Sequence, residues 1–443
     1  MEQTKYTVKQ AKHRPIEVCV PGSKSITNRA LLISALCEGR SVLHGVLFSD
    51  DSRHFIQALK DLGFAVEVDE EKAIVAITGH GGAVPAASHG ERSGADEVDA
   101  LVDALVDVGS AGTAARFLSA FLGLSRGRFH MTSSEQMKKR PMEELLKALT
   151  ELGAEITYEQ ELYHFPFVIG NTGTQGCKEI TIDIDKSSQF LSALLISSVL
   201  FDEDFVIHVV GEHGMAYVDM TIAMMAQFGV TVKRVNDRTF CIPKEAKYTA
   251  REYQIEPDVS AAAYFYAMCP VLHVSAKVAH VHWECLQGDI AFLHVLEQMG
   301  CTTEEEPDGI RMNPPAAVLQ GGTFDLSAFS DQALTLAAIA CFADNDVTIT
   351  HIGHIRYQEC DRLNAITENL TRLGIACEGT DTSVTIHPGR PQGCEILTYE
   401  DHRVAMSFAI PGLVTEGVII ENPMCCRKTF EHYFDVLEEY ICS

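Results

Sequence analysis

The sequence predicts an α/β fold built from six similar units in two domains. Three observations support this prediction: a globular composition, five repeated helix–glycine–strand segments, and six apolar helices rich in small residues. The chain has 443 residues, of which 46% are apolar and 22% charged, close to the average for globular proteins. Such a chain can bury large cores, which excludes a disordered or collagen-like protein.

Each unit opens with a polar turn and a helix of small and apolar residues. A β-type run such as FVIHVV or DVTITHI follows this helix. The six openings are SITNRALLISAL, AGTAARFLSAFL, SSQFLSALLISSVL, DVSAAAYFYAM, DQALTLAAIACFA and DHRVAMSFAIPGLV.

Five units close with an amphipathic helix, a glycine and a predicted strand. Glycine is favoured after a helix because the residue there often adopts a positive φ. In the sixth unit the second helix is FEHYFDVLEEY, and the chain ends without a final strand. The units are about 70 to 90 residues long, which excludes a solenoid of 20–50-residue repeats. The closing glycines are Gly63, Gly153, Gly229, Gly300 and Gly374.

Six units grouped three and three predict two domains, with a break near Ile255–Asp258. We expect residues 21–255 to form one domain, and residues 1–20 with 256–443 to form the other. The predicted strand IEVCV precedes the first unit and can complete the domain whose last unit lacks a closing strand. The chain would then cross between the domains twice, at a natural hinge. The Gly-, Ala- and Ser-rich segment 79–96 is expected to be a loop excursion and not a linker.

Charge and cysteine content limit the possible partners. The 35 Lys and Arg residues face 61 Asp and Glu residues, a net charge of −26, which argues against nucleic-acid binding or a basic membrane-surface role. No uninterrupted apolar stretch reaches about 18 residues, so no transmembrane helix is expected. The 14 cysteines include no CxxC pair, which favours reduced thiols in a cytoplasmic protein.

The helix openings are more polar than a packed interior requires. Helix N-termini offer free N–H groups that suit phosphate or carboxylate, although Ser and Asp there can simply cap the helix. The cations Lys24, Arg29 and Arg403 oppose the helix dipole, so they favour a bound anion. The other polar residues at the openings are Ser25, Ser110, Thr113, Ser187, Ser188, Gln189, Asp258, Ser260, Asp331, Asp401 and His402.

Two other motifs have weak support as sites. PGSKS is not a P-loop, because Val18 and Ser23 stand where the two glycines belong. In HVHWEC a strand would place His280, His282 and Glu284 on one face, yet an ordinary solvated strand face is a better interpretation than a metal site.

Nine segments together resemble, in order, the signatures of the 5-enolpyruvylshikimate-3-phosphate synthase family of enolpyruvyl transferases. The match covers about residues 20 to 435, nearly the whole chain. The segments are PGSKSITNRALL, GSAGTAARFL, RPMEELL, SSQFLSALL, PDVSAAAYF, SDQALTLA, IRYQECDRL, DHRVAM and RKTF.

The resemblance implies a fold and a reaction. The family fold has two domains, each of three βαβαββ units in an inside-out α/β barrel, with the active site in the interdomain cleft. The family reaction moves the carboxyvinyl group of phosphoenolpyruvate to the 5-hydroxyl of shikimate 3-phosphate and releases phosphate, in aromatic amino acid biosynthesis. It uses no metal or organic cofactor, and the enzymes are commonly monomeric.

The resemblance also implies site residues. Both substrates carry several negative charges, so their binding requires several cations. Residues that would bind phosphoenolpyruvate are Lys24, Gly112, Arg140, Gln189, Arg362, Arg403 and Lys428. Residues that would bind shikimate 3-phosphate are Lys24, Ser25, Arg29, Ser187, Ser188, Gln189, Tyr217 and Asp331.

The transfer needs proton movement at a hydroxyl and at a methylene carbon, which two carboxylates and Lys24 can provide. We expect Asp331 to act as the base for the 5-hydroxyl and Glu359 as proton donor and acceptor at the methylene. From the residues alone, Glu359 could instead form a surface ion pair with Arg362 at i+3. His402 is better interpreted as a helix-start residue that orients its neighbours than as a catalyst.

Departures from the family pattern keep two alternatives open. Gln358 replaces a lysine that helps hold shikimate 3-phosphate, and Ser110 replaces an asparagine. They would suit a non-catalytic metabolite-binding homologue, although Lys24, Asp331, Glu359 and Arg403 weigh against it. The other alternative is UDP-N-acetylglucosamine enolpyruvyl transferase, which has a loop cysteine shortly before an Arg-Pro. Here no cysteine lies between Cys37 and Cys177.

Overall fold

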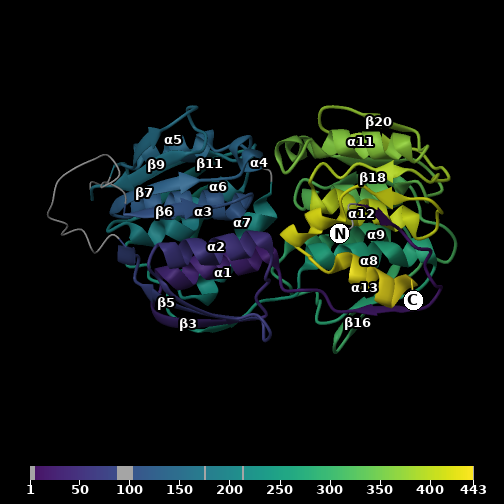
Figure 1. Cartoon of the computed structure of the whole chain (residues 1–443), viewed down its shortest axis with the longest axis horizontal. Coiled ribbons are helices and arrows are strands. Elements are labelled where there is room, and N and C mark those ends of the chain that lie inside the picture. Colours follow the sequence, from purple (N-terminus) through teal and green to yellow (C-terminus); the bar gives the residue numbers. More distant parts are fainter. Residues whose placement is uncertain (1–4, 87–102, 174–175, 212–213, 443) are drawn as a thin grey trace. The chain divides into compact units, whose positions relative to one another are not determined.

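The computed structural model describes residues 5–86, 103–173, 176–211 and 214–442. The chain divides into two compact units, residues 24–255 and residues 1–23 with 256–443, and each is described by itself (Figure 1). Most of the loop excursion expected at residues 79–96 lies outside the described residues. Its described beginning is the end of strand β5 (Ile74–His80) followed by a turn.

The second repeat shows the predicted βαβαββ order directly. Strand β6 (Ala104–Asp107), helix α3 (Gly112–Leu124) and strand β7 (Gly127–Thr132) form a parallel βαβ step, with Ala104 opposite Phe129. After the short helix α4 (Glu135–Lys138), helix α5 (Glu143–Glu151) leads to the antiparallel strands β8 (Glu155–Tyr158) and β9 (Phe167–Asn171). The sheet order is β6-β7-β9-β8.

The other two repeats of residues 24–255 follow the same plan, but the first one is closed by the last strand of the unit. Strand β14 (Glu252–Gln254) lies parallel to β3 (Glu38–His44), with Glu252 opposite Val42. The first repeat comprises α1 (Lys24–Leu36), β3 (Glu38–His44), α2 (Asp50–Asp61), β4 (Ala65–Asp69) and β5. The third comprises β10 (Glu179–Asp183), α6 (Gln189–Ser197), η3 (Ser198–Leu200), β11 (Phe205–Val210), α7 (Met215–Gln227), β12 (Lys233–Asn236) and β13 (Thr239–Ile242).

The fourth repeat takes its first strand from the N-terminal segment. Strand β2 (Ile16–Val18), within the predicted IEVCV, lies parallel to β15 (Ala276–Val278), with Ile16 opposite Ala276. The whole stretch 24–255 is therefore inserted in the chain between β2 and the helix that follows it in the repeat. The rest of this repeat is α8 (Val259–Leu272), β15 (Ala276–Val278), η4 (Gly288–Ala291), α9 (Phe292–Gln298), β16 (Thr302–Glu306) and β17 (Gly309–Asn313).

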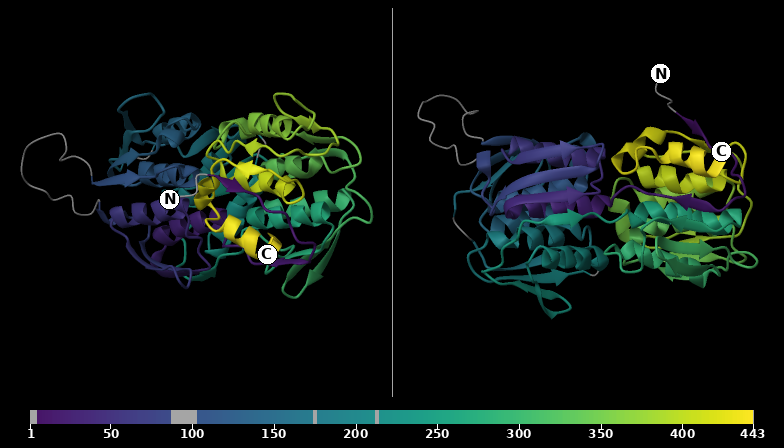
Figure 2. Two further views of the ribbon diagram at one scale, coloured as in Figure 1. Left: turned by 45° about the vertical axis from the view of Figure 1, so that its right-hand side comes forward. Right: turned by 90° about the horizontal axis from the view of Figure 1, so that it is seen from below.

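The last repeat also includes part of the N-terminal segment, because strand β1 (Tyr6–Thr7) pairs antiparallel with β23 (Ile419–Ile420). The fifth repeat comprises β18 (Gly322–Asp325), η5 (Ser330–Gln332), α10 (Ala333–Ala340), β19 (Val347–Thr350), η6 (Gly353–Tyr357), α11 (Arg362–Arg372), β20 (Cys377–Gly379) and β21 (Val384–Ile386). The sixth comprises β22 (Glu395–Ile396), α12 (His402–Gly412), β23 (Ile419–Ile420), η7 (Pro423–Lys428), α13 (Tyr433–Leu437) and η8 (Glu438–Cys442). Figure 2 shows the purple N-terminal segment beside the yellow C-terminal helices, where Lys12 N–H donates to the Ile441 carbonyl at 2.9 Å.

The predicted closing glycines are confirmed. Each follows the C-capping residue of its helix and has a positive φ: +86° at Gly63, +100° at Gly153, +96° at Gly229, +105° at Gly300 and +76° at Gly374. A side chain is strained in this region of backbone conformation, so glycine ends each helix at low cost.

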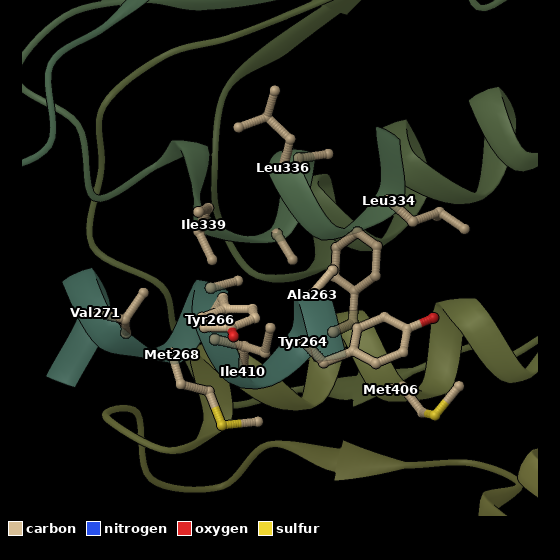
Figure 3. Packing of buried hydrophobic residues seen from close by; sticks show 14 of the residues in the cluster. Ala263, Tyr264, Tyr266, Met268, Val271, Leu334, Leu336, Ile339, Met406 and Ile410 are labelled. Carbon is tan, nitrogen blue, oxygen red and sulfur yellow. The ribbon is translucent and has the colours of Figure 1, made fainter. Parts of the chain in front are cut away.

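The small-residue helices form the centre of each unit. In Figure 3, Tyr264 and Tyr266 of α8, Leu334 of α10 and Met406 of α12 pack in one buried cluster. Every residue of α8 is buried, as expected for a helix that is apolar on all sides. In the other unit α1, α3 and α6 contact one another, and α1 and α2 lie between α3 and the sheet of β3 and β5 (Figure 1). Among the described residues no helix is long and apolar enough to span a membrane.

Candidate active site

Lys24 is the first residue of α1, and its charge is partly balanced inside the unit. Its Nζ lies 3.6 Å from the Asp51 carboxylate of α2. Asp51 is buried near the start of α2, where Ser49 and Ser52 form a capping box. Asp51 was not predicted from the sequence, because an acidic residue in the first turn of a helix normally needs no explanation beyond the helix dipole.

Arg29 lies one turn further along α1 and is buried. Its guanidinium donates to Thr221 Oγ1 at 2.7 Å and to the Tyr217 and Ser25 carbonyls at 3.1 and 3.0 Å, and it stacks over the Phe117 ring. In the described part of the chain, none of its hydrogen bonds goes to a carboxylate, and burial lowers the pKa of Arg29 to about 9. A bound anion would stabilise this buried charge.

Arg116 connects three segments that the resemblance assigned to substrate binding, yet it was not itself predicted from the sequence. Its guanidinium donates to the Gly112 carbonyl at 3.2 Å, to Gln189 Oε1 at 3.2 Å and to the Pro141 carbonyl at 2.8 Å. A Cβ on Gly112 would lie 2.5 Å from Nη1 of both Arg116 and Arg140. Glycine at this position therefore lets two guanidinium groups approach the start of α3.

The predicted polar residues around these cations lie at helix starts. Ser187 Oγ accepts a hydrogen bond from Gln189 N–H at 3.3 Å, and Gln189 Nε2 donates to Thr113 Oγ1 at 3.4 Å. Ser110 Oγ lies 2.7 Å from Ser134 Oγ, the cap of α4. We call the following group the Arg29 cluster: Lys24, Ser25, Arg29, Gly112, Arg116, Arg140, Ser187, Ser188, Gln189 and Tyr217.

A second group of charges surrounds Arg362 in the unit of residues 256–443. The buried guanidinium donates to Asp331 Oδ1 at 3.0 Å, to Glu359 Oε2 at 2.8 Å and to Asp401 Oδ2 at 2.8 Å. Burial alone would lower the pKa of Arg362, but the charges of Asp401, Glu359 and Asp331 outweigh it and raise this pKa. The predicted i+3 pair of Glu359 and Arg362 is thus present, but it is buried and not on the surface.

Two further cations complete this group. Arg403 Nη2 lies 2.7 Å from Asp331 Oδ2, and Lys428 Nζ lies 3.5 Å from Glu359 Oε1. Each of these two carboxylates is therefore held between two cations. The Arg362 cluster comprises Asp331, Glu359, Arg362, Asp401, Arg403 and Lys428, three carboxylates against three cations.

Helix capping places the Arg362 cluster. Asp401 caps α12 by accepting from Arg403 N–H at 2.9 Å, and Asp361 caps α11 by accepting from Asn364 N–H at 3.0 Å. Capping fixes Arg362 and Arg403 in the first turns of their helices. Asp401 has a second role that its position did not reveal, because it also binds the Arg362 side chain. Gln358 Oε1 accepts from Arg362 Nη1.

The prediction of a strand at HVHWEC is wrong. Residues 279–287 form turns after β15, and His280 has a positive φ of +62°. His282 pairs with Glu305 of β16 at 3.0 Å. Within the described ranges, no group of three His, Cys, Asp or Glu residues could hold a metal ion.

Solved structures share this fold. An EPSP synthase from Acinetobacter baumannii matches with a TM-score of 0.79 at 24% identity, covering 99% of this chain and 98% of that chain. The enolpyruvyl transferase NikO from Streptomyces tendae matches with a TM-score of 0.76 at 13% identity, covering 98% and 96%. The chain therefore has the two-domain α/β fold of the enolpyruvyl transferases, as expected from the sequence.

Sequence relatives identify the family within this class. A 3-phosphoshikimate 1-carboxyvinyltransferase from Nostoc punctiforme is 38% identical over 427 residues, 96% of each chain. One from Halalkalibacterium halodurans is 37% identical over 428 residues, 95% of this chain and 91% of that one. The model of the family EPSP synthase (3-phosphoshikimate 1-carboxyvinyltransferase) matches residues 9–437. The chain belongs to this family of transferases, so the resemblance drawn from the nine motifs is confirmed.

Proposed function

We propose that the protein transfers the carboxyvinyl group of phosphoenolpyruvate to the 5-hydroxyl of shikimate 3-phosphate and releases phosphate. One observation carries this proposal: in the Arg362 cluster, Asp331 and Glu359 are each held between two cations. The family reaction needs one group that takes a hydroxyl proton and another that delivers and removes a proton at carbon. Two fixed carboxylates beside cations that attract anions supply both requirements.

The two clusters have different charge balances, which suits different tasks. The Arg362 cluster has three carboxylates and three cations. Gain or loss of one proton by a carboxylate therefore leaves the cluster with only a small net charge. In the Arg29 cluster, Arg29 is buried among hydroxyl and carbonyl oxygens, which favours phosphate binding. We assign shikimate 3-phosphate to Lys24, Ser25, Arg29, Ser187, Ser188, Gln189, Tyr217 and Asp331. We assign phosphoenolpyruvate to Lys24, Gly112, Arg140, Gln189, Arg362, Arg403 and Lys428.

The chemistry then proceeds by addition and elimination. Asp331 accepts the proton of the 5-hydroxyl while the oxygen of that hydroxyl bonds to C2 of phosphoenolpyruvate. At the same time Glu359 delivers a proton to C3. In the elimination, Glu359 takes a proton back from C3 as the bond from C2 to the phosphate oxygen breaks and phosphate leaves. Arg362 and Lys428 flank Glu359, so they stabilise its ionised form when it has given up its proton. Lys24 can balance charge on the leaving phosphate.

Phosphate release tests the proposal directly. Purified protein with both substrates should release one phosphate per carboxyvinyl group transferred, and neither substrate alone should give release. UDP-N-acetylglucosamine in place of shikimate 3-phosphate should be inert. No phosphate release at saturating substrates would indicate a non-catalytic homologue that binds metabolites. Release with UDP-N-acetylglucosamine would indicate a UDP-N-acetylglucosamine enolpyruvyl transferase.

We propose that residues 21–255 form one domain and residues 1–20 with 256–443 the other, a division close to that of the compact units. We also propose a monomer in the cytoplasm. All 14 cysteines have free thiols, which suits a reducing compartment. Size-exclusion chromatography with light scattering tests the monomer.

A further inference from the structure

A buried carboxyl group that the proposed mechanism does not use lies next to the turn that carries Asp331. Asp289 is in the short helix η4 and is 1% exposed. Its Oδ1 accepts hydrogen bonds from Ser260 Oγ and from Gln332 Nε2, both at 2.9 Å. Gln332 follows Asp331 in η5 and is itself buried.

The contacts of Gln332 extend into a buried polar network. Thr335 Oγ1 donates to Gln332 Oε1 at 3.1 Å and lies 3.3 Å from Ser407 Oγ of α12. Gln332 thus uses both ends of its amide group, one on Asp289 and one on Thr335. The network fixes the turn of η5, and with it the backbone of Asp331.

The groups that act on Asp289 come from three elements. Helix α8 contributes the hydroxyl of Ser260, η5 contributes Asp331 and Gln332, and α12 contributes Arg403. Burial and the negative charge of Asp331 raise the pKa of Asp289, while Arg403, Gln332 and Ser260 lower it, to a result of about 6. Asp289 is therefore mostly ionised at neutral pH and gains its proton in mildly acidic solution.

We propose that Asp289 is a positioning residue of the reaction: its buried negative charge strengthens Asp331 as the acceptor of the hydroxyl proton, and its hydrogen bond to Gln332 fixes the turn that carries Asp331. The physical reason is like-charge repulsion. An ionised Asp289 disfavours a second negative charge at Asp331 and so favours proton uptake by Asp331. This inference rests on the proposed function, in which Asp331 is the base.

The charge of Asp289 should make the wild-type kcat depend on pH. Above pH 6 Asp289 is ionised and supports proton transfer to Asp331. As the pH falls through about 6, Asp289 becomes neutral and the support is lost. The wild-type kcat should therefore show an inflection near pH 6.

The experiment compares kcat and KM between pH 5 and 9 for the wild type and two variants. Asp289→Asn keeps an oxygen that can accept from Ser260 and Gln332 but has no charge. Its kcat at pH 8 should fall about 3- to 10-fold, and the inflection near pH 6 should disappear. Ser260→Ala removes a hydrogen bond that lowers the pKa of Asp289, so the inflection should move to higher pH by up to about one unit. KM should change little in both variants.

The outcomes separate this inference from the proposed function. A wild type that releases no phosphate refutes the function and the inference together. An active wild type whose pH profile lacks the inflection, or keeps it in Asp289→Asn, refutes the inference alone. Far-UV circular dichroism checks folding. If Asp289→Asn does not fold, the profile of Ser260→Ala decides, and an inflection that stays or moves to lower pH overturns the inference.

Discussion

At the scale of single residues, the main finding is how Arg362 is held. One guanidinium contacts Asp331, Glu359 and Asp401, and its Nη1 also donates a hydrogen bond to Gln358 Oε1. The planar fork of arginine can make these contacts at once, whereas the single ammonium of lysine cannot. Arg362 therefore sets the orientation of both carboxylates to which we assign proton transfer.

Replacing Asp331 tests its role as the base. Asp331→Ala should lower kcat by about 10² to 10⁴-fold, because it removes a general base from the transition state. Phosphate release at saturating substrates measures the loss, and circular dichroism checks the fold. Asp346→Ala is the matched control, since Asp346 is exposed in the same unit and pairs only with His387 among the contacts described. Equal activity of the two variants would remove Asp331 from the mechanism.

Replacing Gln358 tests what the departure from the family pattern costs. Gln358→Lys adds a cation beside a cluster with as many carboxylates as cations, so the new charge is available to an anionic substrate. KM for shikimate 3-phosphate should fall about 3- to 10-fold, while KM for phosphoenolpyruvate changes less. Gln358→Met, which has a similar length and no charge, is the control. A higher KM for shikimate 3-phosphate in the lysine variant would show that the contact with Arg362 matters more than the charge.

At the scale of elements, the repeats were predictable because their signals are local. A glycine after each of the five amphipathic helices is explained by the backbone strain that another residue would have there. The small-residue helices are apolar on all sides, which by itself predicts that they are buried. The sequence predicted the domain that the IEV strand joins but not the strand with which it pairs. A three-residue strand gives no indication of which sheet edge is free to accept it. The strand expected at HVHWEC failed because alternation over so few residues does not distinguish a strand from successive turns.

The candidate site was predictable only where a residue stands in a motif. Asp51, Arg116 and Asp289 act through contacts between segments far apart in the sequence. The one local signal for Arg116 is an arginine within the apolar run AGTAARFLSAFL. A guanidinium that is buried with such a helix must find several hydrogen-bond acceptors. No comparable local signal marks Asp289.

The start of α3 gives a prediction about Gly112. In Gly112→Ala the new Cβ would lie 2.5 Å from Arg116 Nη1 and Arg140 Nη1, so both side chains must shift. KM for phosphoenolpyruvate should rise about tenfold, or ~1.4 kcal/mol in binding, with a smaller change for shikimate 3-phosphate. Gly123→Ala in the same helix, where the nearest atom would be Ile169 Cδ1 at 3.0 Å, is the control for packing. An unchanged KM in Gly112→Ala would mean that the guanidinium groups do not contact this substrate.

At the scale of the whole molecule, the connectivity is unusual. The stretch 24–255 is inserted between β2 and α8, and its own first repeat is closed by its last strand, β14. At the ends of the insertion, Gly22 and Pro257 form an antiparallel bridge, and Ser23 N–H donates to the Glu256 carbonyl at 2.8 Å. Each compact unit is therefore complete only when segments from both ends of its sequence have met.

Removing the N-terminal segment tests this organisation. Residues 1–20 supply β1 and β2, and their buried side chains Tyr6, Val8, Ile16 and Val18 together contribute roughly 6–12 kcal/mol. This is comparable with the entire stability of a domain. Deletion of residues 1–20 should abolish cooperative unfolding of the unit 256–443, while residues 24–255 still unfold cooperatively.

Fluorescence distinguishes the two units in this experiment. Trp283 is the only tryptophan of the chain, so its emission reports on the unit 256–443, whereas circular dichroism reports on both. Deletion of residues 1–4 is the control and should leave the urea midpoint of Trp283 unchanged. A protein without residues 1–20 that keeps the wild-type midpoint would contradict the importance of β1 and β2.

The pairing of β2 with β15 also has a consequence for synthesis on the ribosome. Ile16 and its partner Ala276 are separated by about 260 residues, so at 5–20 residues per second β2 waits roughly 13–52 s for its sheet. During that time the stretch 24–255 can fold as it emerges, because every strand described in it has its partners inside it. The nascent N-terminal segment meanwhile exposes unpaired apolar strands, and it is there that a holding chaperone would protect the growing chain.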